Sequence, residues 1–364
     1  MRPIRAVVCT ALFACSGAFS AAYAAIDANA SIVSLRTSCT ENNGTVVINN
    51  CFADINTLFN WLSNTRKPSA SAPLLVEIGP GKFTGFISCV APGSFSHVTF
   101  RGAGINRTTI GRLTLGTGCT ELVFSELTVT QQSAGQYAVT ILKPGLNTTW
   151  KNVFLNGNWE EYGTGGNGAI GKHYWFQSRI NGYYQINVDQ SWFFGSEIAN
   201  IQPQVNGENA LTVGAGGEAH VYGSNINVTN SSTTAIDLVA VRVSAGGEAH
   251  IHGTGIDVIS TTVSNITALK AESGGEIHAN GAAYNLRAPA GSSTSRIVKD
   301  ADPQTHVHAP YLWEHIPTLP LTSIQGADMT VIATGTADGR PHIAVYDSNC
   351  QSKWYDTSDK ACVP

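Results

Sequence analysis

The sequence predicts an all-β protein built as a parallel β-solenoid, with a short helix at the N-terminal end and a C-terminal tail or cap. Three related Gly-Gly-Glu-Ala/Ile-His segments recur, and their second glycines, Gly217, Gly247 and Gly275, lie 30 and then 28 residues apart. After each glutamate, apolar and polar residues alternate, which is the period of a β-strand. A repeat of this length, with glycine-marked turns and no 3.6-residue apolar period, is typical of stacked solenoid coils.

The composition agrees with a β-solenoid and excludes some classes of partner. Of the 364 residues only 13% are charged, 43% are hydrophobic and 37 are glycines, which suits one elongated domain of coils with polar turns. The net charge is −4, and the 21 Lys and Arg residues form no basic run, which argues against nucleic-acid binding. Beyond the N-terminus no stretch of 18 apolar residues occurs, so we expect no membrane span.

The first 24 residues have the features of a signal peptide. Arg2 and Arg5 precede an apolar run over residues 6–19, and Ala22 and Ala24 supply the small residues of a cleavage site. We therefore expect a secreted, periplasmic or extracellular protein. The alternative is a lipoprotein anchored through Cys15, although the bulky Phe13 fits poorly into the corresponding motif.

Six cysteines remain after removal of the first 24 residues, and an even number in an oxidising compartment predicts disulfides. We expect neighbours in the sequence to pair: Cys39 with Cys51, Cys89 with Cys119, and Cys350 with Cys362. Cys89 and Cys119 are about one coil apart. Other connectivities stay open. A zinc site is disfavoured because no CxxC motif occurs.

The mature chain divides into three parts. Residues 25–75 are expected to form an N-terminal cap, in which the amphipathic stretch 52–62 is a short helix that seals the solenoid. Residues 76–300 are expected to form the β-helix, with its most regular coils near the Gly-Gly-Glu segments. In residues 301–364 several prolines interrupt any coil, so we expect a cap or docking tail there.

Two stretches resemble the pectinesterases and their pectate-lyase-like relatives. Residues 76–83 (VEIGPGKF), followed by 98–104 (VTFRGAG) and 108–110 (TTI), are similar to the opening coils of this superfamily. Residues 172–186 (KHYWFQSRINGYYQI) are similar to the pectinesterase segment in which an aromatic run and Ile-x-Gly precede the nucleophilic aspartate. The resemblance spans roughly residues 52–212. It implies a right-handed parallel β-helix, secretion and an extracellular polysaccharide as the partner.

The catalytic residues implied by this resemblance are only partly present. Gln185 stands at the place of the nucleophile, and its amide cannot attack a carbonyl as a carboxylate does. Glu160 stands near the place of the general acid and could still transfer a proton. The arginine motif of the family, Gly-Arg-Pro-Trp, has no counterpart at the expected distance, and the similar residues 339–342 lie in the tail. We therefore expect pectinesterase chemistry to be lost.

Other carbohydrate chemistry stays open. A glycoside hydrolase would use two carboxylates, and the candidates are Glu160, Glu161, Asp189 and Glu197. A polysaccharide lyase would use a base such as Lys172, Arg179 or His173 to remove a proton next to a uronate carboxylate. We expect no cofactor, with calcium left open.

Aromatic residues gather between residues 159 and 193 and could stack on sugar rings. The expected sugar-binding residues are Trp159, Tyr174, Trp175, Tyr183, Tyr184 and Trp192, and Phe193 lies beside them. Strand alternation offers the competing interpretation that about half of these rings pack in the core.

The Gly-Gly-Glu coils predict two columns of side chains. If the repeats align, Glu218, Glu248 and Glu276 stack about 4.8 Å apart, beside a column of His220, His250 and His278. A divalent cation or cationic sugar would offset the repulsion of the carboxylates, and the donor types suit a transition metal. We expect instead that the glutamates are solvated and partly paired with the histidines, without a metal. The same expectation applies to the tail histidines, His306, His308 and His315.

Two classes of function follow. The first is a secreted β-helix protein that engages an extracellular polysaccharide, expected to be acidic, either as a binder or as a hydrolase or lyase of altered mechanism. The second is a structural or adhesive surface protein whose C-terminal tail docks a cell-surface partner.

Overall fold

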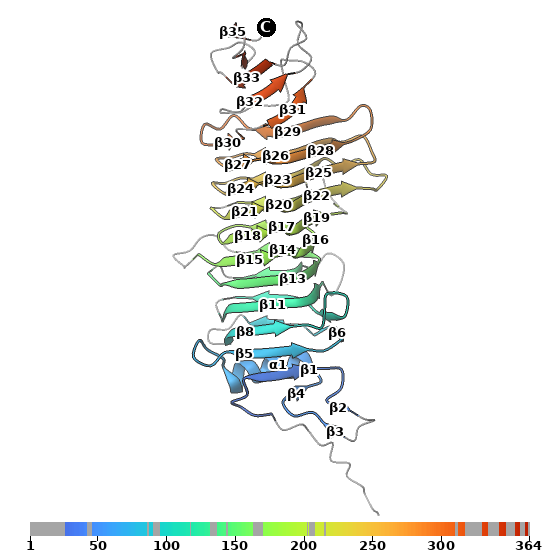
Figure 1. Ribbon diagram of the computed structural model, residues 1–364, viewed down its shortest axis with the longest axis vertical. Helices are drawn as coiled ribbons and strands as arrows, with labels where there is room; N and C mark the ends of the chain where they lie inside the picture. Colours follow the sequence, from blue (N-terminus) through green and yellow to red (C-terminus); the bar gives the residue numbers. More distant parts are fainter. Residues whose placement is uncertain are drawn as a thin grey trace, which may run out of the picture.

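The chain forms an elongated stack of coils that runs from the N-terminal to the C-terminal end (Figure 1). The computed structural model describes residues 26–41, 46–85, 87–89, 95–116, 118–131, 137–142, 145–162, 170–201, 203, 208–214 and 216–309, and five short strands between residues 312 and 362. The expected signal peptide and Cys15 lie outside the described residues. The stacking of parallel strands confirms the predicted β-helix.

Each coil contributes strands to three faces. The first row of strands consists of β1 (Ile32–Leu35), β5 (Leu74–Ile78), β8 (Phe95–Arg101), β15 (Lys172–Phe176), β18 (Gln190–Phe194), β21 (Glu218–Tyr222), β24 (Glu248–His252), β27 (Glu276–Asn280) and β30 (His306–His308). The second row consists of β6 (Gly81–Phe83), β9 (Thr108–Ile110), β16 (Arg179–Asn181), β19 (Glu197–Asn200), β22 (Asn225–Asn230), β25 (Gly255–Ser260) and β28 (Ala283–Arg287). The long strands β11 (Cys119–Thr130) and β13 (Thr148–Asn156) pair with strands of both rows.

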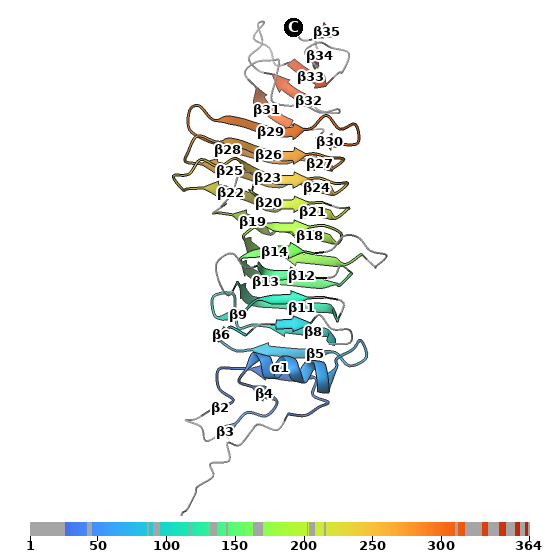
Figure 2. The ribbon, with the colours of Figure 1, turned by 180° about the vertical axis from the view of Figure 1, so that it is seen from behind.

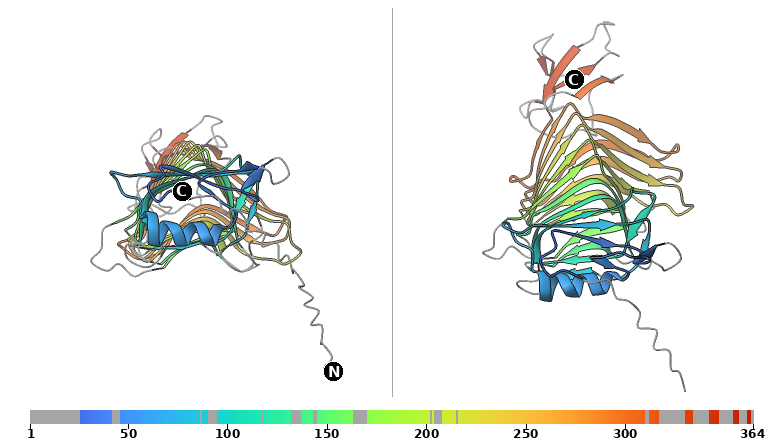
Figure 3. Two further views of the ribbon diagram at one scale, coloured as in Figure 1. Left: turned by 90° about the horizontal axis from the view of Figure 1, so that it is seen from below. Right: turned by 60° about the horizontal axis from the view of Figure 1, so that its bottom comes forward.

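The third face is a separate nine-stranded parallel sheet. It consists of β7 (Ile87–Cys89), β10 (Leu113–Leu115), β12 (Tyr137–Ile141), β14 (Asn158–Glu161), β17 (Tyr184–Ile186), β20 (Glu208–Val213), β23 (Leu238–Val243), β26 (Asn265–Ala271) and β29 (Ser293–Lys299). Its strands follow one another in chain order, one per coil. Figure 3 shows this stacking along the length of the molecule.

The Gly-Gly-Glu segments align in register, as the repeat predicted. Glu218 pairs with Glu248, and Glu248 pairs with Glu276, across β21, β24 and β27. The first glycine of each segment has a positive φ of 74° to 88°, which is costly for a residue with a Cβ. A Cβ on the second glycine would lie 2.9 Å from the preceding coil's backbone at Gly247 and 2.5 Å from it at Gly275. The first position thus requires glycine because of its backbone conformation, and the second because the backbone of the preceding coil leaves no room for a Cβ.

A column of aromatic rings fills the core behind the first row. Phe100, Phe124, Trp150, Trp175 and Phe193 follow one another in register, with ring centroids 4.3–6.2 Å apart and interplanar angles of 8° to 15°. In the Gly-Gly-Glu coils the same column continues as Val221, Ile251 and Ala279. All of these side chains are buried.

A short helix covers the N-terminal end of this core. Helix α1 (Ile55–Trp61) continues into a π-helical turn, η1 (Leu62–Arg66), and buries Ile55, Leu58 and Phe59. Asp54 caps it by accepting a hydrogen bond from the backbone N–H of Thr57 at 2.7 Å. In Figure 2, α1 lies in front of β5 at the N-terminal end of the stack. This confirms the predicted capping helix.

The first coil begins before residue 76, the boundary expected from the sequence. Strand β1 pairs in parallel with β5, and β4 (Cys51–Phe52) pairs with β1. The two-stranded antiparallel sheet of β2 (Thr40–Glu41) and β3 (Val46–Val47) lies between them in the sequence. Residues 25–75 therefore contribute strands to the β-helix as well as its capping helix.

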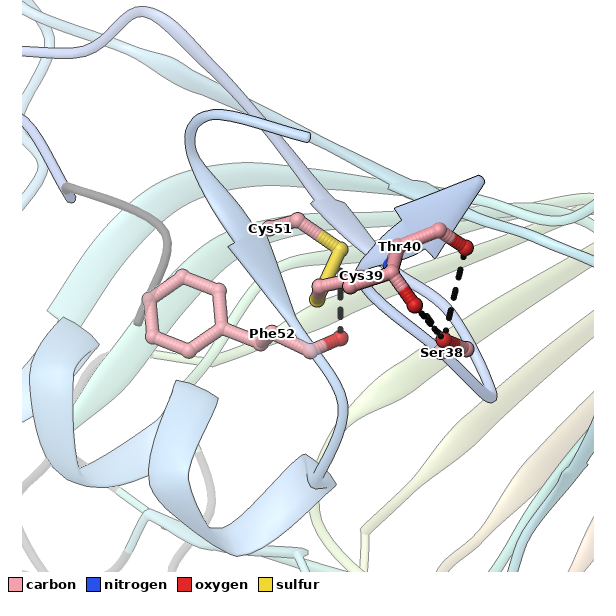
Figure 4. Close-up of a disulfide and its surroundings, with 5 residues drawn as sticks. All are labelled: Ser38, Cys39, Thr40, Cys51 and Phe52. Carbon is pink, nitrogen blue, oxygen red and sulfur yellow. Dashed lines mark hydrogen bonds between the residues drawn. A yellow bond between two sulfur atoms is a disulfide. The ribbon is translucent and has the colours of Figure 1, made fainter. Parts of the chain in front are cut away.

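Two of the three expected disulfides are confirmed. Cys39 and Cys51 join the loop that carries β2 and β3 to β4 (Figure 4), with a Cα–Cα distance of 5.6 Å. Cys89 and Cys119 lie 5.8 Å apart at Cα and link one coil to the next. The expected pair of Cys350 and Cys362 involves Cys350, which lies outside the described residues. The two disulfides are consistent with an extracellular location.

A five-stranded sheet follows the β-helix and lies at its C-terminal end (Figure 1). It consists of β31 (Leu312–Ile316), β32 (Thr330–Ala333), β33 (His342–Tyr346), β34 (Trp354–Asp356) and β35 (Ala361–Cys362). All neighbours in this sheet are antiparallel except β31 and β32. Within the described part of the chain, no helix has the length and apolarity needed to cross a bilayer.

Candidate functional site

Three of the six aromatic residues expected to bind sugar lie in the core. Trp159, Trp175 and Tyr184 have relative exposures of 0–1%. The rings of Trp159 and Tyr184 stack at 4.9 Å, and the indole N–H of Trp175 donates to the Tyr184 hydroxyl at 3.1 Å. The prediction was wrong for these three rings, because strand alternation turns them inward.

Tyr174 and Trp192 face outward but do not offer a sugar-stacking platform. They are register partners in β15 and β18, and their rings stack at 4.9 Å with an interplanar angle of 20°. His220 covers the next face of Trp192 at 4.9 Å and 5°. Since neighbouring rings cover one another's faces, the column presents mainly ring edges to solvent. Stacking on a pyranose needs a free face.

The structure brings Glu160 and Gln185 together on the outer side of the nine-stranded sheet. They are register partners in β14 and β17, and both side chains are half-buried. Three tyrosines lie near Glu160, which is hydrogen-bonded to Tyr162. The ring of Tyr137 meets those of Tyr162 at 6.2 Å and Tyr183 at 6.1 Å, in both cases nearly edge-to-face. We call this set of five residues the tyrosine patch.

The surroundings of Tyr162 and Tyr183 raise the pKa of both phenols. A hydrogen bond with Glu160 is the main cause that raises the pKa of Tyr162. Burial is the main cause that raises the pKa of Tyr183, followed by the hydrogen bond of its hydroxyl to Tyr137 at 3.3 Å. One carboxylate oxygen of Glu160, Oε2, is buried and has no hydrogen-bond partner among the described residues. The patch therefore offers hydroxyl groups, a carboxylate and an amide, with no obvious nucleophile.

Lys172 and Arg179 do not join Glu160 and Gln185, so the four expected catalytic residues form no single site. Lys172 lies on β15 in the first row, with Nζ 5.7 Å from the centroid of the Trp192 ring. Arg179 lies on β16 in the second row, where its Nε is 3.0 Å from Oε2 of Glu197. This expectation is corrected by the fold, because the segments lie on different faces of the coil.

The other expected acids and His173 have structural roles. Asp189 is buried and accepts hydrogen bonds from the backbone N–H groups of Gly145 and Gly171, and it lies 3.3 Å from Nε2 of the buried His173. Glu161 is also buried and accepts hydrogen bonds from the backbone N–H groups of residues 187–189. Burial, followed by repulsion from Asp189, raises the pKa of Glu161. These acids hold turns together and form no exposed catalytic pair.

The expected glutamate and histidine columns are present on the first row. Each glutamate contacts the histidine two residues further on, at 2.7 Å for Glu218, 2.8 Å for Glu248 and 2.9 Å for Glu276. This confirms the predicted pairing. His308 of β30 extends the histidine column, since its ring stacks on that of His278 at 4.8 Å.

Sequence reasoning missed Tyr137 and Tyr162. They come from coils whose lengths differ from those of the Gly-Gly-Glu coils, and no motif surrounds either of them. The signal that His308 belongs to the histidine column was present: His306-Val307-His308 copies the strand pattern of Glu276-Ile277-His278 with histidine in place of glutamate.

Comparisons with known proteins give one structural likeness. No protein-family model matches the chain, and no curated protein is significantly similar to it. Among solved structures, a pectin methylesterase mutant in complex with a hexasaccharide is similar over 75% of this chain and 93% of that chain, with a TM-score of 0.46 and 10% sequence identity. A likeness at this level supports no conclusion about activity or substrate.

Proposed function

We propose that the protein is secreted and binds an extracellular polysaccharide through the tyrosine patch. The observation that carries the proposal is the register pairing of Glu160 with Gln185, with Glu160 bonded to one of three tyrosines whose rings contact one another. Tyrosines combine an apolar ring with a polar tip, and sugar-binding sites use such rings with a few polar groups. The resemblance to pectinesterases in residues 52–212 and the N-terminal signal sequence support the class of ligand and the export.

Binding without ester hydrolysis fits the chemistry of the patch. Gln185 cannot act as the carboxylate nucleophile of a pectinesterase. Glu160 is the sole carboxylate of the patch, and hydrolysis of a glycosidic bond needs two. Lys172 and Arg179, two candidate bases of a lyase, lie on other faces of the coil than the tyrosine patch. A binder is therefore favoured over the three enzyme classes.

The negative charge of Glu160 affects whether an acidic or a neutral glycan can bind at the patch. A uronate next to this carboxylate would be repelled, and Ca²⁺ would offset the repulsion, because calcium prefers carboxylate and other oxygen ligands. We therefore propose that an acidic glycan binds in a calcium-dependent manner, whereas a neutral glycan would bind equally well without calcium.

The test is affinity electrophoresis of the purified protein in gels that contain polygalacturonate, methylated pectin or a neutral glucan, with and without Ca²⁺. We expect retardation by at least one glycan and binding about fivefold to tenfold weaker in Tyr183→Ala, as expected for the loss of one ring contact. Tyr222→Ala is the matched control, because Tyr222 faces outward on the first row. Unchanged binding in Tyr183→Ala would reject the patch.

Methanol release from methylated pectin is measured in the same samples. We expect none, and release would show that ester hydrolysis persists. Binding that maps to residues 305–364 would instead favour the structural or adhesive alternative.

A further inference from the structure

The glutamate and histidine columns form three overlapping triads on the first row. Each triad holds the Oε1 atom of one glutamate, the Nε2 atom of the histidine two residues on, and the Nε2 atom of the histidine in the next coil. The triads are Glu218, His220 and His250; Glu248, His250 and His278; and Glu276, His278 and His308. Within each triad these candidate ligand atoms all lie within 4.8 Å of one another.

The glutamate oxygen lies between two imidazoles in every triad. Its distance to the second histidine is 3.5 Å for Glu218, 3.2 Å for Glu248 and 3.4 Å for Glu276. His250 and His278 therefore each present one Nε2 atom to two carboxylates. A neutral imidazole carries one N–H group, so one hydrogen would serve two acceptors at each of these positions.

No fixed cation of the protein neutralises the stacked carboxylates in the described part of the chain. The ion-pair partners that the structure gives for Glu218, Glu248 and Glu276 are all histidines. Carboxylates one coil apart repel each other. A bound cation would remove this repulsion and would replace the shared hydrogens.

Neighbouring groups already orient the ligands of the first triad. Gln190 donates a hydrogen bond from Nε2 to Oε2 of Glu218, which leaves Oε1 directed at the histidines. The Tyr222 hydroxyl lies 3.4 Å from Nδ1 of His220. If Nδ1 carries the hydrogen, Nε2 has its lone pair free for a metal, which is the usual arrangement of a metal-binding histidine. Trp192 stacks on the His220 ring and restricts its rotation.

We propose that these triads bind divalent transition-metal ions of the zinc class, with the first triad as the strongest site. Two imidazole nitrogens and one carboxylate oxygen form a known zinc donor set that leaves a fourth position for water. Zinc bonds of about 2.0–2.2 Å put tetrahedral ligand atoms roughly 3.4 Å apart, close to the observed nitrogen–oxygen distances of 2.7–3.5 Å. The rings of His220 and His250 stack with their centroids 4.7 Å apart, so the two imidazoles would tilt toward each other to bind one ion. Calcium and magnesium prefer all-oxygen shells, so they do not fit these triads.

The sharing of histidines sets the number of ions. His250 belongs to the first and second triads, and His278 belongs to the second and third. One Nε2 atom binds one ion, so neighbouring triads cannot be filled together. The first and third triads share no residue. The protein should therefore bind two ions per chain.

The test is native mass spectrometry and calorimetric titration of the untagged, EDTA-treated and dialysed protein with Zn²⁺ alone. We expect two ions in the wild-type protein and one in Glu218→Gln, which keeps the size of the side chain. Glu248→Gln should keep both ions, since it removes only the second triad. Tyr222→Phe should weaken the first site by about tenfold, because it removes the group that orients His220.

His252→Ala is the matched control, because His252 lies on the same strand as His250 but outside the triads. It should bind two ions. Absence of Zn²⁺ binding to the wild-type protein, or two ions retained in Glu218→Gln, would overturn the proposal. Circular dichroism of each variant verifies that it is folded.

Discussion

Replacing Trp175 with alanine should greatly lower the stability of the fold, because this ring lies in the core and not on a sugar-binding surface. The side chain is fully buried. Its ring lies 4.8 Å from that of Trp150, 5.5 Å from that of Trp159 and 5.7 Å from that of Tyr184. Truncation of a buried tryptophan costs about 3–5 kcal/mol, a range that already includes the loss of its ring contacts, and the three rings around Trp175 place it at the upper end of that range. The Tyr184 hydroxyl keeps its contact with Ser191 at 3.0 Å, so we expect a cost of about 4–5 kcal/mol.

The assay is urea unfolding of the wild-type protein and the variant, followed by circular dichroism. Trp192→Ala is the matched control, because this ring is half-exposed and contacts Tyr174, His220 and Lys172 on the outer side. Three contacts of about 0.2–1 kcal/mol each limit its loss to about 3 kcal/mol. Equal losses in the two variants, or a larger loss for Trp192→Ala, would refute the assignment of Trp175 to the core and of Trp192 to the surface.

Two further predictions concern the residues around the tyrosine patch. Because burial raises the pKa of Glu161, the folded protein binds this proton more tightly than the unfolded chain does. The stability that this group contributes is therefore full below the unfolded pKa and is lost as pH rises through the higher folded value. Urea midpoints measured between about pH 4 and pH 7 should fall for the wild-type protein relative to Glu161→Gln, and parallel curves would contradict this. Gly182→Ala should lower stability and weaken glycan binding, since φ is 149° and a Cβ would lie 2.6 Å from the backbone of Gly157. The control is Gly195→Ala, where a Cβ meets nothing within 4 Å, and a larger loss there would argue against the steric reason.

The sequence predicted register well where coils repeat and poorly where they do not. Glu218 and Glu248 could be aligned because the same five residues surround both. The orientation of Tyr183 and Tyr184 could not be assigned, because alternation says that neighbours face opposite ways without saying which one faces inward. The core ladder decides this, since Tyr184 packs against Trp159 in the coil before it.

The tyrosine patch depends on distances that a single sequence does not contain. Tyr137 begins β12, Tyr162 directly follows β14 and Tyr183 directly precedes β17, and the loops between these coils differ in length. Their meeting is a result of sheet register and of long side chains. By contrast, the capping helix was predictable from local amphipathicity, and its Asp54 cap lies just before the first helical residue.

The inner column changes from aromatic to aliphatic side chains, and this change determines where further coils could be inserted into the solenoid. From Phe100 to Phe193 the rings of successive coils stack on one another, so an inserted coil would separate rings that are in contact. At Val221 and Ile251 successive coils have nearly the same interior and the same glycine turn. Duplication of one such coil would insert a new segment whose interior suits both neighbours. The C-terminal half of the solenoid can therefore lengthen by whole coils, and each added coil would bring another glutamate and histidine to its outer surface.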